Sequence, residues 1–205
     1  MTLIQEIETG SKSASLKINI IRYYINNGEN TLAELGREMD LSVPTVTKLV
    51  GELIDDGYVI DFGKMETAGG RRPNVYGVNP DSGYFVGVDL KAFSVSIAVI
   101  NFNGTVVHSN IKIPFVQENT QENLDALCNL INNYVDGLEV TKSKIMNVGI
   151  NISGRVNTET GHSFSRYFFN EQPLSEIFHE RLGIPVSIDN DTRAMSYGEY
   201  IGGCV

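Results

Sequence analysis

The stretch LAELGREMDLSVPTVTKLVGELIDDGY, residues Leu32–Tyr58, decides how the first part of this 205-residue chain folds. Its apolar residues recur at helical spacing in two runs, which the short segment Asp40–Ser42 separates. Thr31 precedes the first run and Glu34 follows three residues later, which is the pattern of a capping box. Pro44 stands in the first turn of the second run, where a missing N–H costs least. The second run is expected to bury Val46, Leu49, Val50, Leu53 and Ile54.

The segments on either side extend this pair of helices into a larger motif. Ser13–Asn27 carries apolar residues on one helical face, whereas residues 1–12 are expected to be poorly structured. Tyr58–Phe62 and Asn74–Val78 predict two short strands around the segment GKMETAGGRRPN. A helix, a helix-turn-helix and a two-stranded wing follow one another in a winged helix. We therefore expect an N-terminal winged helix-turn-helix, all-α apart from its wing.

The second helix of such a motif lies in the major groove of DNA, with its first residues at the base edges. Here those residues are Ser42, Val43, Thr45, Thr47 and Lys48, and the wing adds Arg71 and Arg72 for phosphates or a narrow minor groove. The net charge is −9, and residues 1–78 hold eight Lys and Arg against eleven Asp and Glu. DNA contact would therefore depend on a local basic patch. A helical pair that only packs or dimerises, and a wing of solvated charges, are the alternatives.

The second part of the chain predicts an α/β domain. The turn-rich segment Asn79–Gly83 marks the boundary, which gives domains at residues 1–80 and 81–205. Strands are expected at Phe85–Asp89, Ser94–Phe102, Thr105–Ile113, Ile145–Ile152 and Ile184–Ile188. Helices are expected at Glu122–Leu138, at Leu174–Leu182 and from Asp191 or Thr192 to Tyr200. Three strands, a helix, a strand, a helix and a strand follow the order of a ribonuclease-H-like fold.

Polar or glycine-containing segments follow three of these strands, where ligand sites of α/β sheets form. The turn Lys91–Phe93 lacks glycines, so its backbone cannot wrap phosphates closely, and an ordinary hairpin is favoured. Asn151–Asn157 contains a glycine and Arg155, although a plain turn is equally compatible with it. Ile188–Asp191 delivers polar groups that can bind hydroxyls, and a carboxylate there could accept a hydroxyl proton. Helix capping by Asp191 is the simpler alternative.

Three linked motifs resemble the repressor branch of the ROK family of repressors and sugar kinases: GGRRP at Gly69–Pro73, NPDSGY at Asn79–Tyr84 and GVDL at Gly87–Leu90. The resemblance covers essentially the whole chain and implies the first lobe of an actin-like sugar-kinase scaffold. It implies that Gly154, Arg155, Asn190 and Asp191 bind a sugar, with Asp191 at the position of the kinase base. Because the phosphate turn is not matched, no catalytic residue and no kinase activity are expected.

The resemblance also implies operator DNA and a sugar or sugar phosphate as partners, and assembly into dimers or higher oligomers. An ATP-dependent ROK sugar kinase with an appended winged helix is the alternative. Family members are about twice this long, so their second lobe and zinc motif would lie beyond Val205, and no metal or cofactor is expected here. Two cysteines and no signal or membrane segment favour the cytoplasm. The three histidines show no metal-ligand spacing and are expected on the surface or in packing.

Overall fold

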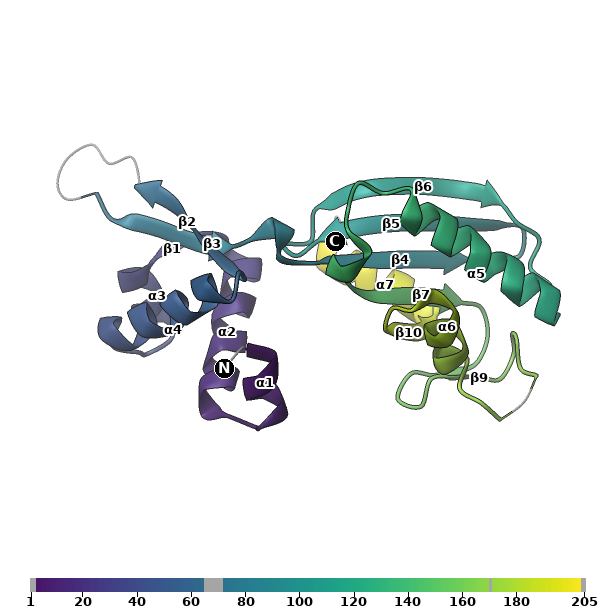
Figure 1. Cartoon of the computed structure of the whole chain (residues 1–205), viewed down its shortest axis with the longest axis horizontal. Coiled ribbons are helices and arrows are strands. Elements are labelled where there is room, and N and C mark those ends of the chain that lie inside the picture. Colours follow the sequence, from purple (N-terminus) through teal and green to yellow (C-terminus); the bar gives the residue numbers. More distant parts are fainter. Residues whose placement is uncertain (1–2, 65–71, 170, 204–205) are drawn as a thin grey trace. The chain divides into compact units, whose positions relative to one another are not determined.

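The computed structural model describes residues 3–64, 72–169 and 171–203 (Figure 1). The chain forms two compact units, one of residues 1–82 with 102–104 and one of residues 83–101 with 105–205. Each unit has its own cluster of buried apolar residues. No helix in the described ranges combines the length and the apolar character that crossing a membrane requires.

The first unit is a winged helix-turn-helix, as predicted. Its three strands form an antiparallel sheet in the order β1-β3-β2, and a bulge in β2 lies between Asp61 and Gly63. Its elements are α1 (Leu3–Glu8), α2 (Lys12–Asn27), β1 (Asn30–Thr31), α3 (Leu32–Glu38), α4 (Val43–Asp55), β2 (Val59–Lys64), β3 (Asn74–Val78) and η1 (Pro80–Ser82).

Two expectations for this unit are wrong. Within the expected unstructured segment 1–12, the described residues 3–12 are ordered, because helix α1 buries Leu3, whose N–H donates to Asp56 Oδ2 at 2.9 Å. Ile54 is not part of the buried stripe of α4, since its side chain is 37% exposed. The other four residues expected in that stripe are buried. Lys17, in α2, is also buried, which is unusual for a lysine side chain.

The second unit is an α/β domain with a five-stranded sheet in the order β10-β7-β4-β5-β6. Strands β10, β7 and β4 are parallel, whereas β4, β5 and β6 run antiparallel. This arrangement confirms the predicted ribonuclease-H-like fold. Its elements are β4 (Tyr84–Leu90), β5 (Ser94–Asn101), β6 (Val106–Pro114), α5 (Gln121–Asp136), η2 (Lys142–Lys144), β7 (Ile145–Ile152), β8 (Val156–Asn157), β9 (His162–Ser163), α6 (Leu174–Leu182), β10 (Val186–Asn190) and α7 (Asp191–Gly202).

One face of this sheet carries the core. Alternate residues of β4 and β5 are buried, as the period of a strand requires, and they pack with α5 and α6. These two helices contact each other, and helix α7 lies behind the sheet in the view of Figure 1. Helix α7 has no buried residue. The parallel strands β4, β7 and β10 end at the same edge, which brings their polar terminal residues together.

Candidate nucleic-acid interface and strand-end site

A close backbone approach fixes the turn between α3 and α4. The Leu41 N–H donates to Gly36 O at 2.8 Å, and Asp40 takes the left-handed conformation with φ 54°. A Cβ on Gly36 would lie 2.9 Å from Leu41 O, so a larger residue would force the turn apart. The turn therefore sets how α4 projects from the unit.

The predicted helix cap at Thr31 is confirmed, with one difference in its hydrogen bonds. Thr31 Oγ1 accepts from the Glu34 N–H at 3.2 Å and donates to Glu34 Oε2 at 2.8 Å. The Thr31 N–H instead donates to Asn30 Oδ1 at 2.8 Å. Glu34 therefore bonds the hydroxyl of the cap residue and not its backbone amide.

The N-terminal half of α4 presents the residues that the sequence assigned to DNA. Ser42 caps the helix by accepting from the Thr45 N–H at 3.3 Å, and the two hydroxyl oxygens lie 2.7 Å apart. Thr47 Oγ1 donates to Val43 O at 2.8 Å and keeps its lone pairs for an external donor. Val43 is 48% exposed. The Lys48 side chain is 77% exposed. Its ammonium lies 3.9 Å from Glu52, which is a long and therefore weak ion pair, so the ammonium is available to a phosphate.

A groove of about 910 Å³ joins the start of α4 to the base of the wing. Arg72 is exposed in it, whereas Arg71 lies outside the described residues. Lys64 faces the same groove from β2, so the wing contributes two cations beside the exposed Val43. The lining residues are Thr31, Leu32, Ala33, Val43, Lys64, Arg72, Pro73, Asn74 and Tyr76.

Lys17 does not contribute to the exposed positive charge of the first unit. Its side chain is 1% exposed and pairs with Glu6 at 2.9 Å and with Glu52 at 2.8 Å. Two carboxylates therefore neutralise it on the buried side of the unit. Lys48 and Arg72, by contrast, are exposed cations of this unit.

In the second unit, the strand ends gather a polar row. Asp89 of β4 pairs in register with Asn151 of β7, which pairs with Asp189 of β10. Lys91 lies 3.4 Å from Asp89, and Arg193 lies 2.5 Å from Asp189. A cation thus compensates each carboxylate of the row.

Three of the four predicted sugar-binding residues meet beside this row. The Asn190 side-chain amide donates to Gly154 O at 2.8 Å and to Asp191 Oδ1 at 3.1 Å. Asn190 Oδ1 accepts from the Arg193 N–H at 3.1 Å, so Asn190, and not Asp191, caps helix α7. Arg155 is exposed nearby, with its guanidinium carbon 5.2 Å from the centre of the Phe164 ring. We call these four residues the strand-end corner.

The turn between β4 and β5 is closed by its own hydrogen bonds. The Lys91 N–H donates to Ser94 O at 2.9 Å, while the carbonyl groups of Ala92 and Phe93 accept from amides that follow β6. Phe93 is 77% exposed at the tip. An amide committed to its own hairpin and a bulky ring are poorly suited to wrapping a nucleotide phosphate.

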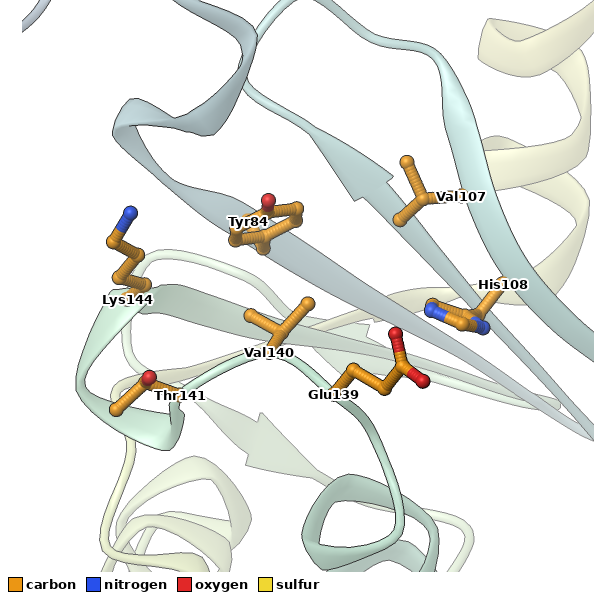
Figure 2. Close-up of a pocket in the computed structure, with 7 residues that line it drawn as sticks. All are labelled: Tyr84, Val107, His108, Glu139, Val140, Thr141 and Lys144. Carbon is orange, nitrogen blue, oxygen red and sulfur yellow. The ribbon is translucent and has the colours of Figure 1, made fainter.

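A separate pocket of about 350 Å³ opens near the other ends of the strands (Figure 2). Tyr84, at the start of β4, pairs with Ile145, at the start of β7, so this pocket lies far along the strands from the corner. Figure 2 shows the Glu139 carboxylate turned toward the His108 ring. The pocket contains none of the predicted site residues; it is lined by Tyr84, Val107, His108, Glu139, Val140, Thr141 and Lys144.

The fold and its surfaces define a protein in which a winged helix-turn-helix precedes a lobe of the sugar-kinase type. Residues 15–60 match the winged helix-turn-helix DNA-binding family, and residues 85–204 match the ROK family. Because the second match covers more than half of the chain, the chain belongs to the ROK family.

Named relatives agree with this assignment. The chain is 30% identical to the xylose repressor of Caldicellulosiruptor bescii, over 89% of this chain and 46% of the repressor. It is 29% identical to a glucokinase of Streptomyces coelicolor, over 58% of this chain and 36% of the kinase. A solved ROK family transcriptional regulator, a homologue of the Escherichia coli MLC protein, has a TM-score of 0.66 at 22% identity. The structural match covers 91% of this chain and 48% of the regulator's chain. At this level of identity the match supports the fold alone. The chain therefore spans about half the length of the xylose repressor that it matches.

Proposed function

We propose that this chain contains the DNA-binding and effector-binding parts of a sugar-responsive transcriptional repressor. The observation that supports it best is the groove that joins the exposed Val43 of α4 to Lys64 and Arg72 of the wing. A recognition helix beside a cationic wing suits a DNA duplex, because the helix contacts base edges while the wing neutralises phosphates.

The effector in this proposal is a sugar or sugar phosphate, and the strand-end corner is its site. The corner combines a fixed amide at Asn190, a carboxylate at Asp191 and a guanidinium at Arg155, which are groups that can bind hydroxyls. The relative from Caldicellulosiruptor bescii is named a xylose repressor, so xylose is the first effector to test.

The proposed mechanism has two states. Two or more chains associate and present paired winged helices to two half-sites of an operator. A sugar that binds one arrangement of the kinase-like domain more tightly shifts the population toward it. That shift changes the spacing of the paired helices and lowers their affinity for the operator.

The test begins with selection of duplexes from a random library by the chain, followed by mobility shifts with the recovered sequence. We expect one sequence class to be enriched, and xylose or another sugar of a panel to weaken the shift. Absence of any enriched sequence would contradict sequence-specific DNA binding. A shift that no sugar alters would contradict effector control.

An ATP-dependent sugar kinase with an appended winged helix is the second candidate. Asp191 at the strand-end corner and the similarity to a glucokinase favour it. The closed turn at Lys91 and the exposed Phe93 disfavour it, because phosphoryl transfer depends on cradling the phosphates. We expect no phosphorylation of xylose or glucose in an ATP-coupled assay, and turnover above the background would establish the kinase instead.

A further inference from the structure

Aromatic rings cluster on the loop between β7 and α6. His162 stacks on Phe164 with ring centres 6.0 Å apart and planes 14° apart, and Phe168 lies 6.1 Å from Phe164. Phe164 is 42% exposed and Phe168 is 53% exposed. Exposure of two neighbouring phenylalanine rings forgoes the burial that such side chains normally gain, which points to a binding role.

The rings are held in place. The Phe164 N–H donates to Arg155 O at 2.9 Å, and the Arg155 guanidinium lies over the Phe164 ring. The two His162 ring nitrogens lie 2.9 Å from Thr160 Oγ1 and 3.0 Å from Glu171 O. The cluster is therefore a preorganised surface, which loses little freedom when a ligand binds.

Tyr167 fixes the loop to helix α5. Its side chain is 2% exposed, and its hydroxyl donates to Asn123 Oδ1 at 2.7 Å. Burial raises the pKa of Tyr167 to about 12, so the hydroxyl keeps its proton and its hydrogen bond well into the alkaline range. The Tyr167 N–H also donates to Asn119 Oδ1 at 3.2 Å.

Gly154 connects the ring cluster to the strand-end corner. Its φ is +102°, and a Cβ there would overlap the side chain of Ser165. Ser165 Oγ accepts from the Arg155 N–H at 3.0 Å, and Gly154 O accepts from the Asn190 amide at 2.8 Å. The exposed rings and the hydroxyl-binding groups are thus joined through a few direct contacts.

We propose that Phe164 and Phe168 form the aromatic wall of the sugar site, against which the apolar face of a sugar ring stacks. Asp191, the remaining lone pair of Asn190 Oδ1 and the guanidinium of Arg155 then bind the hydroxyls at the ring edge. A sugar has both an apolar C–H face and a polar edge, so an aromatic surface beside fixed polar groups matches it. No carboxylate of the described residues forms an ion pair with Arg155, and its donors are available. This inference rests on the proposed sugar response.

The test is calorimetric titration of the chain with xylose, glucose and glucose 6-phosphate. We expect Phe164→Ala to weaken the binding of the preferred sugar by about fivefold or more, because ring stacking is lost. Phe164→Tyr keeps the ring face and should bind within about twofold of the wild type. Phe169→Ala is the matched control, because Phe169 is 40% exposed on the same loop but lies beside Tyr167, 6.3 Å away.

The possible outcomes separate this inference from the function on which it rests. If the wild type binds a sugar and Phe164→Ala binds it equally well, the aromatic wall is wrong and the sugar response stands. If the wild type binds none of the three sugars, both are overturned. Thermal melting and gel filtration accompany each titration. If Phe164→Ala lowers the melting temperature, the sugar affinities of Phe168→Ala and Phe164→Tyr replace it as the test of the aromatic wall. Weaker binding by Phe168→Ala supports the wall, and unchanged binding contradicts it. Loss of self-association with unchanged sugar binding would assign the rings to a second copy and overturn the inference.

Discussion

The Lys17 ammonium of α2 lies 2.8 Å from the Glu52 carboxylate of α4, the second helix of the helix-turn-helix. The same ammonium lies 2.9 Å from Glu6 of α1, so one buried cation joins three helices. Lys17 is 1% exposed, whereas the side chains of Glu6 and Glu52 are 13% and 35% exposed. This contact connects the N-terminal helix to the C-terminal half of α4 through Glu52.

Replacement of this cation should destabilise the first unit. We expect Lys17→Met to lower the free energy of unfolding by about 1–3 kcal/mol, because it leaves two carboxylates without their partner. Urea denaturation measures the change. Lys48→Met is the control, since Lys48 is exposed and 3.9 Å from the same carboxylate, and it should change stability by less than about 0.5 kcal/mol. Equal effects of the two variants would contradict a structural role of the buried pair.

The same ion pairs predict a dependence of stability on pH. The hydrogen bond from Lys17 lowers the pKa of Glu52 below its ordinary 4.5, despite partial burial. A lowered folded-state pKa stabilises the fold above the ordinary value, and this contribution is lost as pH falls through the lowered pKa. The melting-temperature gap between wild type and Glu52→Gln should therefore be constant near neutrality and close in acid. A gap that widens in acid would contradict this assignment.

The alkaline limb follows from Lys17. Burial by itself lowers its pKa, but the hydrogen bonds and charges of Glu52 and Glu6 outweigh burial and raise the pKa above 10.5. Its stabilising contribution is then complete below 10.5 and is lost as pH rises through the raised value. The difference in melting temperature between wild type and Lys17→Met should persist to pH 10.5 and shrink beyond it.

The sequence was sufficient for the order of the longer helices and strands, because their periodicity and turn residues are local signals, but it did not predict the two-residue strands β1, β8 and β9. It was not sufficient for α1, which has six residues and is too short to be stable alone. That helix depends on the burial of Leu3 and on the contact between Glu6 and Lys17, which are distant in the chain. Without that contact in view, Lys17 was indistinguishable from a solvated lysine.

The candidate sites were predictable to different extents. The candidate DNA-contacting residues at the start of α4 could be predicted from their positions at and after Ser42, and they are exposed in the structure. The strand-end corner follows from the ends of β7 and β10, but the register that aligns Asp89 with Asn151 does not. The aromatic cluster was missed because Phe164 and Phe168 lie in a loop without periodicity. A run of aromatic residues after a glycine-containing turn was the available signal.

Removal of a cation from the proposed DNA surface should weaken binding at every sequence alike. Lys48→Ala and Arg72→Ala should each flatten the slope of log affinity against log salt by about one, because one phosphate contact is lost. Mobility shifts at several salt concentrations measure the slope. Lys112→Ala, an exposed lysine of the second unit, should leave it unchanged. An unchanged slope in both test variants would remove these residues from the interface.

Gly154→Ala should disturb the strand-end corner in two ways. The residue has φ +102°, which strains any L side chain, and a Cβ would overlap Ser165. We expect a loss of about 1–3 kcal/mol and faster hydrogen exchange across residues 153–169. Gly87→Ala is the control, because a Cβ on Gly87 would lie 3.9 Å from its nearest neighbour, Ala98 O. The stability of this variant should stay within about 0.5 kcal/mol of the wild type.

A second substitution separates the two causes. Ser165→Gly removes the side chain that the new Cβ would meet, so the double variant should recover the steric part of the loss but not the backbone strain. Recovery also has a limit, because Ser165 Oγ accepts the Arg155 N–H and that bond is lost with it. If the double variant loses as much stability as the two single variants together, backbone conformation alone requires glycine at residue 154, and close packing against Ser165 does not.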